Sequence, residues 1–131
     1  MRILIVDDSM VSRVKAREAL KVFEDVEFVE AANGEEAIPY LTVPDHIAEL
    51  VILDTQMPEM NGHELLEIMK GHNIRIPVIM VTAEQRKNEV VKALNLGAKN
   101  YLSKPYTAKM LADKVESVMA AVGGGLKRRI P

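Results

Sequence analysis

The stretch ILIVDDS at residues 3–9 joins a continuously apolar run to two adjacent carboxylates and a hydroxyl. Four consecutive Ile, Leu and Val residues are typical of a strand buried on both faces of a parallel sheet. Residues 50–53 and 77–81 form similar runs, residues 26–31 alternate as an edge strand would, and residues 100–102 form the shortest run. The sequence therefore predicts five short strands.

Amphipathic patterns of helical period separate these runs. They cover about residues 10–23, a segment that opens at residue 33, and residues 62–71, 84–96 and 107–122. Asn33 is the expected cap of the second helix, with Glu36 returning to the N–H of Asn33. Pro39 lies beyond the first turn, where a proline costs about 3 kcal/mol, so we expect this helix to kink or to start late. Strict alternation of strands and helices predicts a doubly wound α/β fold with a parallel sheet and helices on both faces.

The composition is that of one ordinary globular domain: 131 residues, no cysteine, and 17 Lys+Arg against 19 Asp+Glu. The lack of cysteine excludes disulfide scaffolds, thiolate zinc sites and thiol catalysis. The nearly balanced charge argues against direct nucleic-acid binding. No apolar run approaches the roughly 20 residues that span a bilayer, and no signal peptide is recognisable, so we expect a cytoplasmic domain without membrane insertion.

The sequence also indicates where the folded domain ends and where the histidines lie. Residues 1–122 are expected to form the folded domain, and residues 123–131, three glycines followed by a short basic end, a flexible tail or the start of a linker. The histidines His46, His63 and His72 lack metal-ligand spacing and are expected to be surface or loop residues.

Polar side chains gather where the predicted strands end. Asp7 and Asp8 follow the first strand and Asp54 the third, while Thr82 and Lys104 follow the fourth and fifth. In an open parallel sheet, ligands bind beyond the carboxyl ends of the strands. We therefore expect these side chains to converge on one edge. Thr82 also has a second interpretation, as the N-cap of the following helix.

The charge of this cluster indicates its chemistry. Three carboxylates crowded into a partly desolvated rim repel one another, and the ammonium of Lys104 balances only one of them. A divalent cation balances the other two, and oxygen ligands without His or Cys favour Mg²⁺, with Mn²⁺ as the alternative. A strand-end carboxylate beside such a metal, a lysine and a threonine hydroxyl is suited to phosphoryl transfer, with Asp54 as nucleophile and an aspartyl phosphate as product.

The chain resembles the receiver domains of bacterial two-component response regulators, and chemotaxis regulators in particular. The resemblance covers about residues 1–122 and is carried by ILIVDDS at 3–9, LVILDTQMPEMNG at 50–62, VIMVTA at 78–83 and GAKNYLSKP at 97–105. Each motif alone is weak, but their order at the ends of the predicted strands is specific. The resemblance implies a flavodoxin-like (βα)5 fold with strand order 2-1-3-4-5. Helices one and five would then cover one face of the sheet, and helices two, three and four the other.

The same resemblance assigns roles to individual residues. It implies that Asp54 accepts the phosphoryl group, while Asp7, Asp8 and the backbone carbonyl of Gln56 join it in holding Mg²⁺. Lys104 would pair with the phosphoryl oxygens, and the Lys104–Pro105 peptide bond is predicted cis.

The switch residues are implied in the same way. Thr82 would bond a phosphoryl oxygen, and Tyr101 would rotate inward from an exposed rotamer. These movements would change the surface formed by the fourth helix, the fifth strand and the fifth helix.

The implied function is a phosphoacceptor signalling switch in a phosphorelay rather than an enzyme with turnover. Its partners would be a histidine kinase or histidine phosphotransfer protein and a downstream protein or output domain, with a phosphorylation-dependent homodimer as a further use of the same surface. Two alternatives remain: a Mg²⁺-dependent phosphohydrolase with an aspartyl-phosphate intermediate, and an interaction domain independent of phosphorylation. Adjacent rather than alternate aspartates argue against the first, and intact Asp54, Thr82 and Lys104 against the second.

The chain departs from the family pattern in one helix, where Pro39 is unusual. Thr55, Gln56 and Glu84 occupy variable positions that flank the path of an attacking water, so the lifetime of the phosphorylated state is left open.

Overall fold

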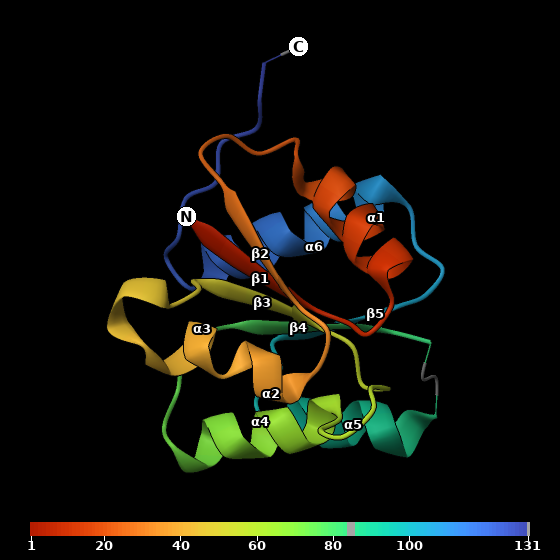
Figure 1. Cartoon of the computed structure of the whole chain (residues 1–131). Coiled ribbons are helices and arrows are strands. Elements are labelled where there is room, and N and C mark those ends of the chain that lie inside the picture. The colour runs from red at the N-terminus through yellow and green to blue at the C-terminus, as the bar shows by residue number, and fades with distance from the viewer. Residues whose placement is uncertain (84–85, 131) are drawn as a thin grey trace.

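The computed structural model describes residues 1–83 and 86–130 and contains one five-stranded sheet in the order β2-β1-β3-β4-β5 (Figure 1). All neighbouring strands pair in parallel. The strands are β1 (Arg2–Val6), β2 (Glu27–Ala31), β3 (Leu50–Leu53), β4 (Val78–Thr82) and β5 (Asn100–Ser103). The predicted fold and strand order are confirmed.

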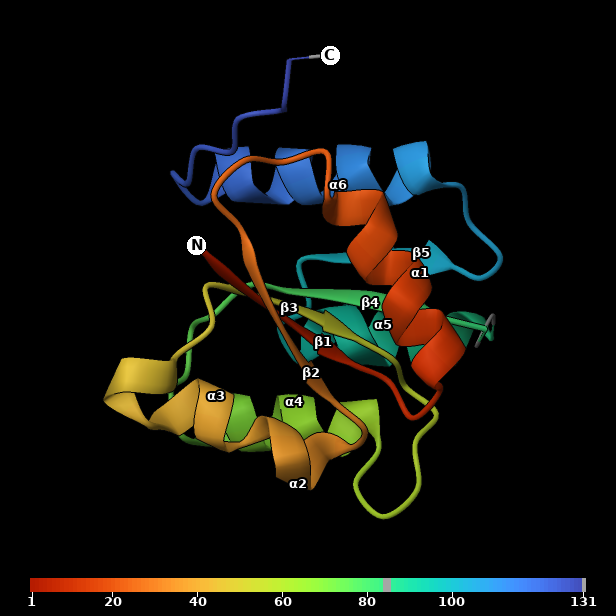
Figure 2. The same ribbon diagram turned by 45° about the horizontal axis from the view of Figure 1, so that its top comes forward.

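The helices form a layer on each face of the sheet, which Figures 1 and 2 show above and below the strands. They are α1 (Met10–Leu20), α2 (Gly34–Ala37), α3 (Pro39–Thr42), α4 (Gly62–Gly71), α5 (Lys87–Asn95) and α6 (Ala108–Ala121), with a short 3₁₀ turn at Pro44–His46. Helices α1 and α6 cover one face and α2 to α5 the other, as predicted. None of the described helices has the length and apolarity needed to cross a membrane.

The core consists of two apolar clusters separated by the sheet. Successive residues of β1 serve them in turn: Ile3 and Ile5 face α1 and α6, whereas Leu4 and Val6 face α2 to α5. All residues of β3 and β4 are buried, whereas β2 at the sheet edge is largely half-buried. The continuous and alternating runs of the sequence thus correspond to central and edge strands.

Pro39 divides the second predicted helix into two short ones. Helix α2 ends at Ala37, and α3 begins at Pro39, where a missing N–H breaks no helical hydrogen bond. The side chain of Asn33 caps α2 by accepting from the N–H of Glu36 at 2.9 Å. The carboxylate of Glu36 accepts from the N–H of Ala32 at 3.0 Å, one residue before the partner that the sequence predicted.

The C-terminal segment is packed onto the domain, contrary to the expected flexible tail. The N–H of Glu24 donates to the carbonyl of Lys127 at 2.8 Å, and Phe23 and Arg128 form an isolated antiparallel bridge. Leu126 packs against the α1–α6 cluster, and the guanidinium of Arg128 lies 5.4 Å from the centre of the Phe23 ring. These apolar and cation–π contacts order a segment that three glycines had indicated to be flexible.

Candidate functional site

Three aspartates meet at the carboxyl edge of the sheet. Val6 and Leu53 are paired in the sheet, so Asp7 and Asp54 follow β1 and β3 at the same level. The N–H of Asp54 donates to the carbonyl of Val6 at 3.0 Å, which extends the strand pairing into the site. Carboxylate oxygens of Asp7, Asp8 and Asp54 lie within 4.8 Å of one another. Asp7 and Asp54 are 6% and 7% exposed, whereas Asp8 is open to solvent.

Lys104 supplies the expected positive charge. The Lys104–Pro105 bond is cis, as predicted, and the N–H of Lys104 donates to the carbonyl of Thr82 at 2.9 Å. Its Nζ donates to Oδ2 of Asp7 at 2.7 Å and lies 3.4 Å from Oδ2 of Asp54. Partial burial acts to lower the pKa of Lys104, but the hydrogen bond to Asp7 and the charges of Asp54 and Asp7 outweigh it and raise that pKa. The lysine is therefore held as a cation between the two buried carboxylates.

The donor set of this acid cluster fits Mg²⁺. The three aspartates offer only oxygen ligands, and among the described residues no histidine or cysteine joins them. The backbone fixes two of the carboxylates, because Oδ1 of Asp7 accepts from the N–H of Ser9 at 2.9 Å and Oδ1 of Asp54 accepts from the N–H of Gln56 at 3.2 Å. Asp8 is the exposed member of the cluster, so a cation bound beside it would remain in contact with water.

Thr82 lies at the end of β4 and is fully buried. Its Oγ1 is 2.7 Å from Oγ1 of Thr55, the residue after Asp54. Helix α5 begins at Lys87 with Arg86 as its N-cap, so the interpretation of Thr82 as the cap of this helix is wrong. The other predicted neighbour, Glu84, lies outside the described residues.

Gly62, the first residue of α4, lies against the backbone that follows β3. A Cβ atom there would lie 2.3 Å from the carbonyl oxygen of Asp54, closer than any side chain can approach a backbone atom. The N–H of Gly62 also donates to the carbonyl of Thr55 at 3.1 Å. The start of α4 is thus pressed against the backbone that presents Asp54, and only glycine fits there.

The two tyrosines near the site differ in burial. Tyr101 on β5 is half-buried and packs against the α2–α5 cluster, whereas we expected it to begin from an exposed rotamer. Tyr106, which no motif singled out, is 6% exposed. Burial, and to a smaller extent the charge of Asp7, raises the pKa of Tyr106 to about 12.

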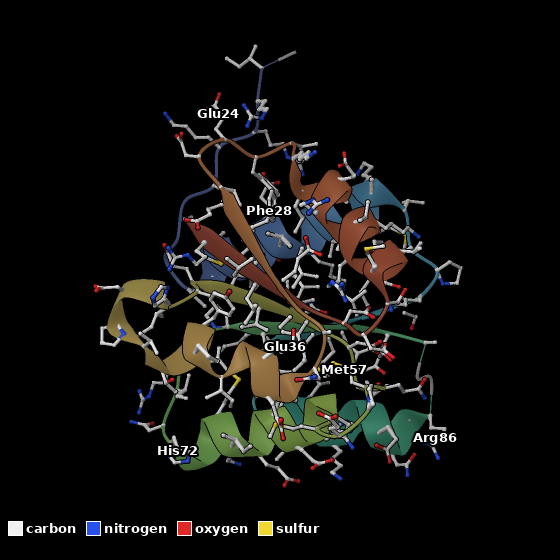
Figure 3. All side chains as sticks on the ribbon, viewed as in Figure 1. Glu24, Phe28, Glu36, Met57, His72 and Arg86 are labelled. Carbon is white, nitrogen blue, oxygen red and sulfur yellow. The ribbon has the colours of Figure 1, made fainter. Side chains whose placement is uncertain are left out.

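His63 is buried, contrary to the prediction of a surface or loop histidine, with 7% of its surface exposed. His72, in contrast, lies exposed at the far end of α4, as Figure 3 shows, and His46 is exposed in the 3₁₀ turn. The clue in the sequence is that His63 precedes Leu66 by three residues, which places both on one helical face.

A polar hollow of about 440 Å³ opens beside the three aspartates. Asp8, Gln56, Met57, His63, Arg86 and Glu89 contribute to its walls. The labelled Met57 and Arg86 lie toward the same end of the α4–α5 layer in Figure 3. The loop after β3 and the start of α5 therefore share one opening next to Asp54.

The chain is similar to known proteins in both sequence and fold. Residues 3–116 match the family described as response regulator receiver domain. The chemotaxis protein CheY homolog of Campylobacter jejuni is 37% identical over 126 residues, covering 95% of this chain and 96% of that protein. A CheY-like response regulator receiver domain protein of Methanospirillum hungatei has a TM-score of 0.82 at 30% identity, covering 92% of this chain and 94% of that one. A chain in the CheX–CheY–BeF3–Mg+2 complex of Borrelia burgdorferi has a TM-score of 0.81 at 31% identity, with 91% and 89% covered.

Proposed function

Because the chain belongs to the family of response regulator receiver domains, which are signalling switches, we propose that Asp54 accepts a phosphoryl group from a phosphohistidine of a kinase or histidine phosphotransfer protein. The observation that carries this proposal is the position of the Lys104 ammonium between Asp7 and Asp54 at the edge of the acid cluster. Family membership favours the switch over the phosphohydrolase considered above.

The proposed reaction is a single phosphoryl transfer. A carboxylate oxygen of Asp54 attacks phosphorus in line, a P–O bond forms, and the P–N bond to the donor histidine breaks with its electron pair returning to the imidazole. Lys104 remains protonated and faces the negative charge of the transferred group. The carboxylate of Asp7, which already accepts from Lys104 and from the N–H of Ser9, keeps the ammonium in this direction.

Asp7, Asp8 and Asp54, with the backbone carbonyl of Gln56, would hold Mg²⁺ or, as the alternative, Mn²⁺. The bound cation would neutralise charge on the carboxylates and on the phosphoryl oxygens. The support for this assignment is the short spacing of the three carboxylates and their oxygen-only chemistry.

The switch then uses the proposed roles of Thr82 and Tyr101. A phosphoryl group on Asp54 attracts the Thr82 hydroxyl away from Thr55, its present partner at 2.7 Å. Tyr101 lies on the neighbouring β5 and packs against the same cluster as Ala93 of α5, so its side chain adjusts to the altered packing. The surface formed by α5, β5 and α6 changes as a result.

The proposed partners meet different parts of the surface. Met10 and Val11, 67% and 78% exposed at the start of α1, offer apolar area beside Asp8 for the phosphohistidine-bearing protein. A downstream protein, an output domain or a second copy of the chain would read the surface of α5, β5 and α6. We place this domain in the cytoplasm, where it acts without nucleic-acid binding or membrane insertion.

The test is to incubate the chain with a small phosphodonor and Mg²⁺ and to map the added phosphate by mass spectrometry. Asp54→Asn is expected to abolish labelling, and chelation of the metal to reduce it strongly. Glu59→Gln, which changes a nearby acidic residue of the same loop, is the matched control and should label like the wild type. Labelling that persists in Asp54→Asn at the same position of the peptide map would overturn the proposal.

A further inference from the structure

His63 makes two contacts with a single residue of the neighbouring helix. Its Nε2 lies 3.2 Å from the carbonyl oxygen of Glu89, and its Nδ1 lies 3.5 Å from Oε2 of the Glu89 carboxylate. A carbonyl oxygen only accepts, so Nε2 carries the proton and donates this hydrogen bond. The imidazole thereby joins the first turn of α4 to the first turn of α5, two helices of the same layer in Figure 1.

The α4 side of this contact is fixed to the site. His63 directly follows Gly62, whose backbone is pressed against the carbonyl of Asp54 and hydrogen-bonded to Thr55. Such close-packed backbone has no space to shift toward Asp54. The position of the imidazole is therefore set by the backbone of Asp54 and Thr55.

On α5, the position of the contact depends on Thr82, the residue that moves in the proposed switch. Glu89 lies in the first turn of α5, and the chain reaches this helix from Thr82 at the end of β4. Helix shifts in switching proteins are about 1–2 Å, enough to break a hydrogen bond that is already 3.2 Å long. Movement of α5 with Thr82 would therefore separate Glu89 from His63.

We propose that His63 is a positioning residue that holds α5 in the resting arrangement through Glu89 and thereby sets how readily the domain adopts its phosphorylated conformation. This inference rests on the proposed function of Asp54. On this proposal the contact breaks in the active state, so its removal raises the population of the active state and tightens the binding of a phosphate mimic. Loss of one buried hydrogen bond is expected to tighten that binding about fivefold.

The experiment titrates beryllofluoride in the presence of Mg²⁺ into the wild type and three variants and measures Kd by calorimetry. His63→Leu keeps the buried volume and removes both contacts, and it is expected to bind about fivefold more tightly. His63→Gln keeps an N–H donor for the Glu89 carbonyl and should stay within about twofold of the wild type. Asn88→Ala, exposed in the same turn of α5, is the matched control and should not change Kd.

Thermal unfolding of the same variants separates positioning from support of the fold. If His63 only stabilises the fold, His63→Leu melts at a lower temperature and binds the mimic with unchanged or weaker affinity, and the inference is wrong. If His63→Leu does not fold, His63→Met, which also lacks a donor for the Glu89 carbonyl, takes its place and should tighten binding about fivefold; unchanged Kd there overturns the inference. Failure of the wild type to bind beryllofluoride, or equal binding by Asp54→Asn, would instead overturn the proposed function.

Discussion

Tyr106 illustrates how a residue outside the motifs is shaped by the phosphoacceptor site. Its ring is buried beside the site and shares a small hollow with Asp7, Ser12 and Lys104. The ammonium of Lys15 lies 4.4 Å from the ring centre on the outer side. The phenol therefore stays neutral to a pKa of about 12, because burial and the charge of Asp7 both disfavour a phenolate.

This pKa predicts a loss of stability in alkali. The neutral phenol contributes fully to the free energy of unfolding below the unfolded-state pKa of about 10. This contribution is lost as the pH rises from 10 toward about 12, because the phenol ionises first in the unfolded chain. Tyr106→Phe removes this contribution, so its free energy of unfolding should fall less than that of the wild type between pH 8 and 11.5. With solvent screening, we expect a difference of about 1 kcal/mol. Urea unfolding at both pH values measures it, and parallel losses in the two proteins would contradict the assignment.

At the scale of elements, the junction between β3 and α4 positions the phosphoacceptor. Helix α4 starts with a capping box, in which Asn61 accepts from the N–H of Glu64 and the Glu64 carboxylate accepts from the N–H of Asn61. The next residue, Gly62, brings the helix into contact with the Asp54 carbonyl. The cap fixes where the helix begins, and the glycine fixes how close it lies to the site.

Gly62→Ala is therefore expected to destabilise the domain by about 1–3 kcal/mol and to weaken beryllofluoride binding, since a methyl group there displaces the backbone of Asp54. The matched control is Gly71→Ala in the last turn of the same helix, where an added Cβ meets nothing within 4 Å. Alanine favours a helix over glycine, so this control should gain up to about 1 kcal/mol. Urea unfolding and calorimetry measure both effects, and equal behaviour of the two variants would rule out the close contact at Gly62.

The sequence predicts an element well when its pattern reflects burial alone. The run at Leu50–Leu53 is apolar because β3 is covered on both faces, and Pro39 interrupts a helix by its own geometry. Asp54 and Lys104 were predictable because parallel strands end at one edge.

The contacts that the sequence did not reveal depend on packing between distant segments. The clash at Gly62 arises only when α4 meets the β3 loop, and the burial of His63 only when α5 lies beside α4. The three glycines at 123–125 indicated a flexible tail. The packing of Leu126 depends instead on the apolar cluster beneath α1 and α6, which the local sequence does not show. Periodicity within one segment carries no information about such partners.

At the scale of the whole molecule, the C-terminal segment closes the end of the domain opposite the acid cluster. Arg128 pairs with Asp113 and Glu116 of α6 at 3.0 Å each, while the N–H of Arg129 donates to the carbonyl of Val22 just after α1. The segment therefore joins the two helices that cover one face of the sheet. Glu24, labelled in Figure 3, lies in the loop that pairs with it.

Removal of residues 126–131 is expected to lower the free energy of unfolding by about 1–2 kcal/mol, through lost burial of Leu126 and lost backbone hydrogen bonds. Arg128→Ala alone should cost less than about 1 kcal/mol, because its ion pairs are exposed. Beryllofluoride affinity should be unchanged in both, since no described contact joins this segment to the acid cluster. Urea unfolding tests the first two statements, and an unaltered midpoint after truncation would show that the segment does not stabilise the domain.

Met1 and Lys127 contact one and the same loop, which has a practical consequence for measurement. The terminal ammonium of Met1 donates to the carbonyl of Asp25 at 2.9 Å, and Lys127 accepts from Glu24 in the same loop. A surface anchor or fluorescent reporter attached after the C-terminal segment would lie at the amino edge of the sheet, facing away from Asp54. Immobilised molecules would present their carboxyl edge uniformly to the bulk solution, so binding to a sensor surface would report the phosphoacceptor side without steric interference from the attachment.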